Sequence, residues 1–132
     1  MKNSFLYFSI LVFLVFNLNL LAQEVEIKSS KIQYDDNSKV TIFEGDVSSR
    51  DEKGNKLFSE YAKYNKLEEV IETKGNTKII TSGEYEVYSS DVIFDNKKKI
   101  IFSNNKTDII DKDGNTISVE MFNYSILTNI FF

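Results

Sequence analysis

The sequence predicts an all-β protein built from repeats of about 30 residues, and three observations support this prediction. An aromatic residue recurs at intervals of 30, at Tyr34, Tyr64, Phe94 and Tyr124. A turn-forming residue stands eleven positions after each of the first three, at Gly45, Gly75 and Asn105. Short apolar runs lie between these turns: VTIF at 40–43, EVIE at 69–72 and KIIF at 99–102. A fixed period of this length is typical of a repeat architecture.

The repeating unit is predicted to consist of strands, with three short runs in each period. The runs are rich in Val, Ile, Tyr and Phe and are bounded by Gly, Asn and Asp, which is typical of strands and turns. No window after Gln23 keeps a helical apolar stripe for three turns. The strongest helical candidate, residues 59–69, alternates acceptably and aligns with the β-branched run 89–94, so we predict a strand there.

A second set of turns contains Gly54, Gly83 and Gly114. The segment Asp111-Lys112-Asp113-Gly114-Asn115 resembles part of a helix–loop–helix calcium loop, but its glycine comes two positions early and its twelfth position is Phe122. The first period carries a similar Asp51-Glu52-Lys53-Gly54-Asn55. We therefore interpret these segments as hairpins with Gly or Asn at positive φ.

The N-terminus has the pattern of a secretory signal peptide. Lys2 precedes an apolar run from Phe5 to Phe16, and Ala22 then gives way to polar residues. We predict a signal peptide over residues 1–22 and one domain over residues 23–132. An uncleaved membrane anchor is the alternative, since residues 5–22 approach the length of a membrane helix.

The composition excludes several classes of function. The formal net charge of −4 is spread along the chain, whereas nucleic-acid binding needs clustered basic residues. The run Lys97-Lys98-Lys99 is interpreted as a solvated turn. With no Cys, the domain must be held together by strand pairing and apolar burial.

The sequence gives no sign of an enzyme, a metal site or a cofactor. Histidine and cysteine are absent, which removes the usual general base, the thiol nucleophile and the commonest metal ligands. Acidic residues are present, but most fall in predicted turns, where Asp caps the backbone. A polysaccharide-acting β-solenoid would need acids clustered on one face, so it ranks third among the candidate functions.

Apolar side chains recur in each period, and stacked repeats bring equivalent positions into continuous rows. From the residues alone, these rows are either a packed core or an open trough that holds a lipid. The candidate trough residues are Ile32, Tyr34, Val40, Ile42, Val47, Phe58, Ala62, Tyr64, Val70, Ile79, Val87, Val92, Phe94, Ile101, Ile109, Ile117, Val119 and Phe122.

Short motifs in a fixed order resemble the OstA-like (organic solvent tolerance) domain of lipopolysaccharide-transport proteins. They are I-x-Y-D at 32–35, E-G-D-V at 44–47, D-x-x-G-N-x-L at 51–57 and the repeated aromatic-Asp at 94–95. The resemblance covers about residues 25–132. The second period has Gly75-Asn76-Thr77 and the third has Asn105 in place of Gly, departures that affect turn geometry.

The resemblance implies a folded-over antiparallel sheet, a β-jelly-roll (β-taco) with a V-shaped apolar interior. It also implies a periplasmic, non-catalytic role in which the interior shelters lipopolysaccharide acyl chains on the way to the outer membrane. The implied partners are lipopolysaccharide, other OstA-like domains joined by edge-strand pairing, and an outer-membrane barrel or lipoprotein. This favours the trough over the closed core.

Residues 130–132 correspond to 100–102, so we expect the sequence to stop within a fourth repeat. The family then offers two members, a shortened periplasmic bridge or the N-terminal part of the outer-membrane assembly protein. The competing class is a non-transport β-repeat, structural or adhesin-like, with a closed core.

Overall fold

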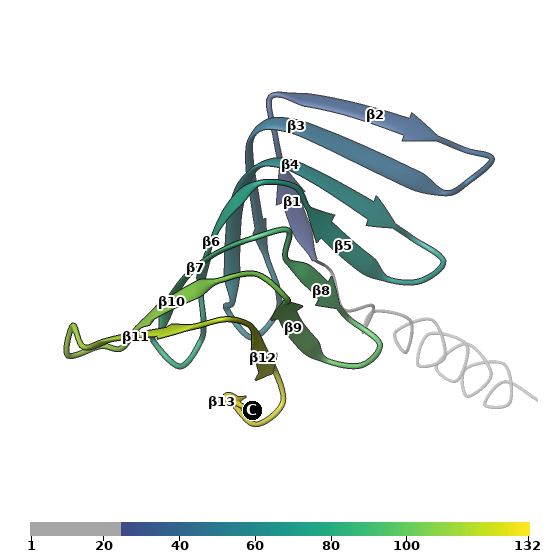
Figure 1. The fold of residues 1–132 in the computed structure, drawn as a ribbon. Coiled ribbons are helices and arrows are strands. Elements are labelled where there is room, and N and C mark those ends of the chain that lie inside the picture. The colour runs from purple at the N-terminus through teal and green to yellow at the C-terminus, as the bar shows by residue number, and fades with distance from the viewer. Residues whose placement is uncertain (1–24) are drawn as a thin grey trace, which may run out of the picture.

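The computed structural model describes residues 25–132, so the predicted signal peptide at 1–22 lies outside the described residues. The described chain folds into one antiparallel sheet of thirteen strands, as the sequence predicted (Figure 1). The strands are β1 (Glu26–Lys28), β2 (Lys31–Asp35), β3 (Val40–Arg50), β4 (Lys56–Asn65), β5 (Val70–Thr73), β6 (Asn76–Ile80), β7 (Glu86–Ser90), β8 (Ile93–Asp95), β9 (Ile100–Ser103), β10 (Thr107–Ile110), β11 (Thr116–Val119), β12 (Phe122–Ser125) and β13 (Ile130–Phe131). Within residues 25–132, no helix is long and apolar enough to cross a membrane.

The sheet is folded over into two wings, which Figure 1 shows as the two arms of a V. Strands β3 and β4 run through the fold and contribute to both wings, because β3 pairs with β1 and β2 and β4 pairs with β5 and β6. We call wing A the side formed by β2, β5, β8, β9, β12, β13 and the adjoining halves of β3 and β4. Wing B is the side formed by β1, β6, β7, β10, β11 and the other halves of β3 and β4.

The bend between the wings is made by the predicted turn positions Gly45 and Gly75 and their neighbours. Gly45 and Asp46 have φ of 74° and 48°, and the β3–β4 register shifts between Glu44 and Val47. This β-bulge bends the first repeat without breaking the strand. In the second repeat the chain leaves the strand at Lys74 and Gly75 (φ 77°), so β5 and β6 are separate. Our prediction of three runs in each period was therefore wrong: the second and third periods contain four short strands each.

The hairpin turns of wing A repeat one geometry without glycine. The last residue of each turn has a positive φ between 54° and 57°, at Lys39, Glu69, Lys99 and Asn129. Its carbonyl in the first three turns accepts a hydrogen bond from the first residue of the next turn, at 2.9–3.0 Å. The turns therefore stack on one another, and the sequence pattern of Gly and Asn did not predict this conformation for Lys or Glu.

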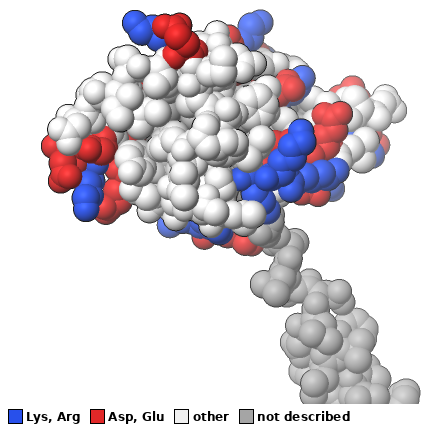
Figure 2. Space-filling model, turned by 60° about the horizontal axis from the view of Figure 1, so that its bottom comes forward, with Lys and Arg blue, Asp and Glu red and all other residues white. Residues whose placement is uncertain are grey.

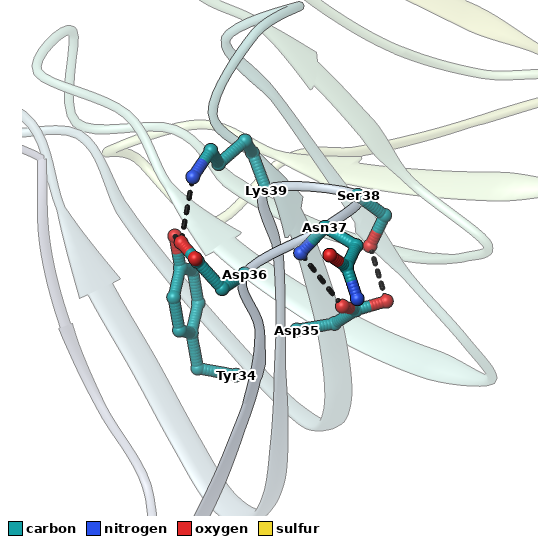
Figure 3. A network of polar contacts seen from close by, with 6 residues as sticks. All are labelled: Tyr34, Asp35, Asp36, Asn37, Ser38 and Lys39. Atoms are coloured by element: carbon teal, nitrogen blue, oxygen red, sulfur yellow. Dashed lines mark hydrogen bonds and ion pairs between the residues drawn. The ribbon is translucent and has the colours of Figure 1, made fainter.

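Capping side chains explain why these turns form. Asp35 accepts hydrogen bonds from the backbone N–H of Asn37 (2.9 Å) and the hydroxyl of Ser38 (2.7 Å), as Figure 3 shows. In the next repeat Asn65 accepts from the backbone of Leu67 and Glu68. Short polar side chains at the end of a strand stabilise such turns by bonding the backbone two or three residues on.

The wing B turns contain the predicted glycines, with one difference. Gly54 and Gly114 have φ of 90° and 86°, as predicted. Gly83 does not carry the positive φ of its turn; Glu84 does, with φ of 65°. The positive-φ positions 54, 84 and 114 therefore keep the 30-residue period, and only the glycine of the second repeat is displaced by one residue.

A row of small polar residues lies where the wings meet. Ser59, Thr77, Ser89 and Thr107 occupy neighbouring strands and are buried. The hydroxyls of Ser89 and Thr107 hydrogen-bond to each other at 2.7 Å, and the hydroxyl of Thr77 is 2.7 Å from that of the neighbouring buried Thr73. No buried side-chain N or O atom in residues 25–132 lacks a hydrogen-bond partner. Small, satisfied side chains allow the two walls to approach closely at the fold.

Candidate functional site

The interior of the folded sheet is the candidate site, and wing A presents a continuous row of side chains to it. The strand registers place these residues in one line across the wing: Tyr34, Thr41, Tyr64, Ile71, Phe94, Ile101, Tyr124 and Phe131. Except at Thr41, every repeat places an aromatic or branched apolar side chain in this row. The aromatic residues that recur every 30 positions in the sequence therefore lie in one row of the sheet.

Wing B presents a matching row to the same interior. The registers align Ile27, Ser49, Leu57, Ile79, Val87, Ile109 and Ile117 across the wing. Ile79 and Val87 are fully buried, and Leu57 is nearly so. The two rows form the walls of one apolar core.

Most of the predicted trough residues line this interior. Nine belong to the buried core: Val47, Ala62, Ile79, Val87, Val92, Phe94, Ile101, Ile109 and Phe122. Tyr64 and Val119 are partly buried and pack against it. Ile32, Tyr34 and Ile117 continue inward rows to the edges of the sheet, where they are 58%, 55% and 63% exposed.

Four predicted residues lie on the outer face instead: Val40, Ile42, Phe58 and Val70. Each is next to an inward residue in its strand, as Ile42 is next to buried Phe43 and Val70 to buried Ile71. Successive side chains in a strand point to opposite faces, so these four cannot share the interior. Our prediction that they share one face with the core residues was wrong.

Several inward residues were missed by the sequence prediction. They are Ile27, Phe43, Leu57, Ile71, Ile126 and Phe131. Strict use of the 30-residue period would have found four of them. Ile27 and Leu57 align with Val87 and Ile117, and Ile71 and Phe131 align with Ile101.

The interior is closely packed in this structure. The largest fully buried side chains include Tyr124, Ile71, Ile79 and Ile101. Between the wings lies a cavity of about 10 Å³, lined by Leu57 and Ile79 from wing B and by Phe94 and Ile101 from wing A. This volume is at the lower limit for a single water, so the walls must separate before a larger molecule can enter.

The edges of the sheet differ from its middle. At one end β2 exposes Ile32 and Tyr34, and at the other the segment from β11 to the C-terminus exposes Ile117, Met121, Leu127, Ile130 and Phe132. Figure 2, with the lower face of Figure 1 turned forward, shows charged side chains around a broad area that carries none. The molecule therefore offers apolar surface at both ends of its interior.

The acidic turns are structural in this fold. Asp111 accepts hydrogen bonds from the backbone of Asp113 and Asn115 and from the Asn115 side chain, at 2.8–2.9 Å. These bonds, with the Asn115 side chain contributing most, lower the pKa of Asp111. The segment 111–115 is thus the hairpin that the sequence predicted. Within residues 25–132, no group of three or more acidic side chains is arranged to hold a metal ion.

The lysine run 97–99 is also part of a turn, as predicted. Lys97 Nζ donates to the Leu67 carbonyl at 2.7 Å, and Lys98 forms an ion pair with Asp95 at 3.1 Å. Burial alone would raise the pKa of Asp95, but the backbone and side-chain hydrogen bonds from Lys98 outweigh it and lower that pKa. These lysines link and cap neighbouring turns.

Comparison with known proteins identifies the fold. No family model matches the chain, and no curated protein matches it. Among solved structures it is similar to LptH from Pseudomonas aeruginosa, with a TM-score of 0.71 and 18% sequence identity over 83% of this chain and 81% of that one. That structure is titled as the LptA homologous periplasmic component of the conserved lipopolysaccharide transport device. The likeness shows that this chain has the same curled, antiparallel β-jelly-roll fold.

Proposed function

We propose that this chain is a periplasmic domain that shelters the acyl chains of lipopolysaccharide during transport towards the outer membrane. The observation that carries the proposal is the pair of inward rows, which run from edge to edge of the folded sheet. Except at Thr41 and Ser49, both in β3, every position of the two rows carries an aromatic or branched apolar side chain, so the walls offer an acyl chain an apolar path once they separate. The fold shared with a lipopolysaccharide-transport component supports the same function.

The edges of the sheet suit the partners that we propose. Strand β2 at one end and β11 and β13 at the other each pair on one side only. An exposed strand edge can accept a strand from another sheet, which would extend both the sheet and its interior. We propose other OstA-like domains as these partners, together with an outer-membrane barrel or lipoprotein at the end of the path.

The location follows from the predicted export signal. Cleavage after about residue 22 would release residues 23–132 as a periplasmic domain. The mass of the exported protein tests this directly. A mass that retains residues 1–22 would favour the membrane-anchored form.

Photo-cross-linking tests the proposal. A benzophenone amino acid placed at the inward Phe94 or Tyr64 should label with lipopolysaccharide. The same probe at Ile93, the outward neighbour of Phe94 in β8, and at Lys98 in the adjoining turn should not. Thermal unfolding of each labelled protein checks that the buried probe has not unfolded the domain.

A structural repeat with a permanently closed core is the second candidate, and the packing of the described interior favours it. The core residues are almost completely excluded from solvent, and the pockets lined by both wings have volumes of about 10 and 70 Å³. Such a protein would remain unlabelled at Phe94 and Tyr64 while folded. Equal labelling of inward and outward probes would contradict the trough as well.

A further inference from the structure

The last hairpin of wing A crosses the mouth of the V and bonds to wing B. This hairpin comprises β12, the turn 126–129 and β13, and lies at the bottom of Figure 1. Lys53 Nζ, in the first turn of wing B, donates to the Ile126 carbonyl at 3.1 Å. The hydroxyl of Ser82, in the next turn of wing B, donates to Asn129 Oδ1 at 3.0 Å. The tips of the two wings are therefore joined at this point.

An aromatic contact joins the wings beside these hydrogen bonds. The ring of Phe131 meets that of Tyr85 from wing B edge to face, with centroids 5.2 Å apart. On its other sides Phe131 contacts Tyr124 at 4.9 Å and Phe122 at 6.3 Å, both in wing A. Phe131 thus occupies apolar space between the wings at this end of the interior.

Side chains in the earlier turns of wing A bond to other residues of wing A. Lys39 pairs with Asp36 in its own turn, and Asn96 and Lys97 bond to Glu69 and Leu67 in the preceding turn. These bonds hold wing A together along its length. The bonds of the last hairpin run across the opening instead, and so they oppose separation of the wings.

The hairpin is attached in a way that allows it to move. Strand β13 pairs with β12 through only two residue pairs, Tyr124 with Phe131 and Ser125 with Ile130. The hairpin is held to wing B by the hydrogen bonds from Lys53 and Ser82 and by the ring contact with Tyr85, and its Ile126 and Phe131 also pack against the apolar core. These can break while the four-residue pairing of β12 with β9 persists.

We propose that the β12–β13 hairpin is a latch, in which Phe131 fills the site of an acyl chain and the bonds to Lys53 and Ser82 hold the wings closed. The inference rests on the proposed lipid-sheltering function and adds the step that controls it. At the opposite end of wing A, Ile32 and Tyr34 are more than half exposed, whereas Phe131 packs against the core. Entry of lipid along the full interior then requires the hairpin to swing away from wing B.

Reversible locking of the latch tests this inference, because the sequence contains no native cysteine to interfere. In the full chain, Ser82→Cys with Asn129→Cys places two thiols across the mouth. A short bis-methanethiosulfonate reagent bridges them, and reductant releases them. The matched control is Asp108→Cys with Ser118→Cys, a cross-strand pair on the outer surface of β10 and β11 whose bridge leaves the mouth free.

The readout is the rate of uptake of fluorescently labelled lipopolysaccharide by bridged and released protein. We expect bridging at 82 and 129 to slow uptake at least tenfold, reductant to restore it, and the control bridge to change it less than twofold. Equal uptake by the bridged and released forms would overturn the latch and leave the proposed function standing. A released protein that is folded but takes up no lipopolysaccharide would instead overturn the proposed function.

A second variant tests the plug without a cross-link. Phe131→Ala removes the ring from between the wings, so uptake should become several-fold faster while the far-UV circular dichroism stays that of a β-sheet. Leu127→Ala is the control, since Leu127 lies in the same hairpin but is exposed. An unchanged or slower rate for the Phe131 variant, in protein shown to be folded, would contradict the inference.

Discussion

The neighbouring residues Ile100 and Ile101 in β9 allow one prediction to be worked out in detail. Ile101 is 1% exposed and lies in the inward row of wing A, between Phe94 and Tyr124. Ile100 is partly exposed and points outward, beside Asp95 and Ser125. The same substitution changes residue type and strand propensity equally at the two positions. A difference in the loss of stability therefore reports the burial of Ile101 in the interior.

The expected magnitudes follow from what each substitution removes. Ile101→Ala takes away three carbon groups at about 0.8 kcal/mol each, and the cavity left behind brings the loss to about 3–4 kcal/mol. Ile100→Ala removes the same atoms from a half-exposed site, so about 1 kcal/mol or less is expected. A small domain has a total stability of about 5–15 kcal/mol, so the first variant loses a large fraction of it.

Chemical denaturation with urea, followed by circular dichroism, measures the two losses. In thermal unfolding the midpoint should fall by about 10–20 °C for Ile101→Ala and by about 5 °C or less for Ile100→Ala. Equal losses, or a larger loss at Ile100, would refute the assignment of the inward and outward faces. The pair Ile79 and Ile80 in β6 repeats the comparison in wing B.

Three further predictions concern turns and charge. Gly45→Ala should destabilise the fold by about 1–2 kcal/mol in urea unfolding, because φ is +74° and the new Cβ would lie 3.2 Å from the Cβ of Ser30; a neutral result would contradict the bend geometry. Asn55→Ala should lower the free energy of unfolding by about 1–3 kcal/mol, because the buried Asn55 side chain bonds both Asp51 and the Ser82 backbone. The exposed equivalent Asn115→Ala should lower it by less. Thermal midpoints compare the two variants, and equal losses would show that burial is not the cause. The pKa values of Asp35, Asp95 and Asp111 are lowered in the folded state, so the unfolded chain binds more protons in acid. The contribution of these carboxylates to stability should be present above about pH 4 and disappear as the pH falls further. A urea midpoint that does not fall between pH 5 and pH 3 would contradict this.

The strand content and the repeat could be predicted because they depend on local pattern. The 30-residue aromatic period and the Gly-containing turns identified strands, and the same period aligns Val87 with Ile117 and Phe94 with Tyr124, all of which lie in the inward rows. The period works because equivalent residues lie two strands apart in the same row, as Tyr64, Phe94 and Tyr124 do with Ile71 and Ile101 between them. In these rows, the place of a residue in the sequence repeat also determines which residues it lies beside in the sheet.

Near Gly45 it was harder to predict which face of the sheet each side chain lies on. The run Val40-Thr41-Ile42-Phe43 has apolar residues on both faces, so alternation alone does not choose between them. The bulge at Gly45 and Asp46 places two residues of β3 opposite one of β4, and the buried positions of β4 change from Ala62 to Ser59 across it. The sequence shows the glycine but not the register, and Ile42 was assigned to the wrong face as a result.

The turns and the latch depend on contacts that a linear pattern does not contain. Lys39 and Glu69 adopt a conformation usually given to Gly or Asn because a capping residue at 35 or 65 and the stacked next turn fix it. The contact of Phe131 with Tyr85 joins residues from opposite wings, and it follows from how the sheet closes. Only the folded arrangement of the sheet reveals these contacts.

Methyl NMR of isoleucine tests the central claim, that the inward rows bind acyl chains, most directly. Each of three Ile-Ile pairs has one isoleucine that points into the interior and one that points outward: Ile79 and Ile80, Ile101 and Ile100, Ile109 and Ile110. On titration with lipopolysaccharide, we predict intermolecular NOEs from acyl chains to the methyl groups of Ile79, Ile101 and Ile109, with little change at their outward partners. NOEs confined to the outward methyl groups, or none to either set in the folded protein, would contradict the account.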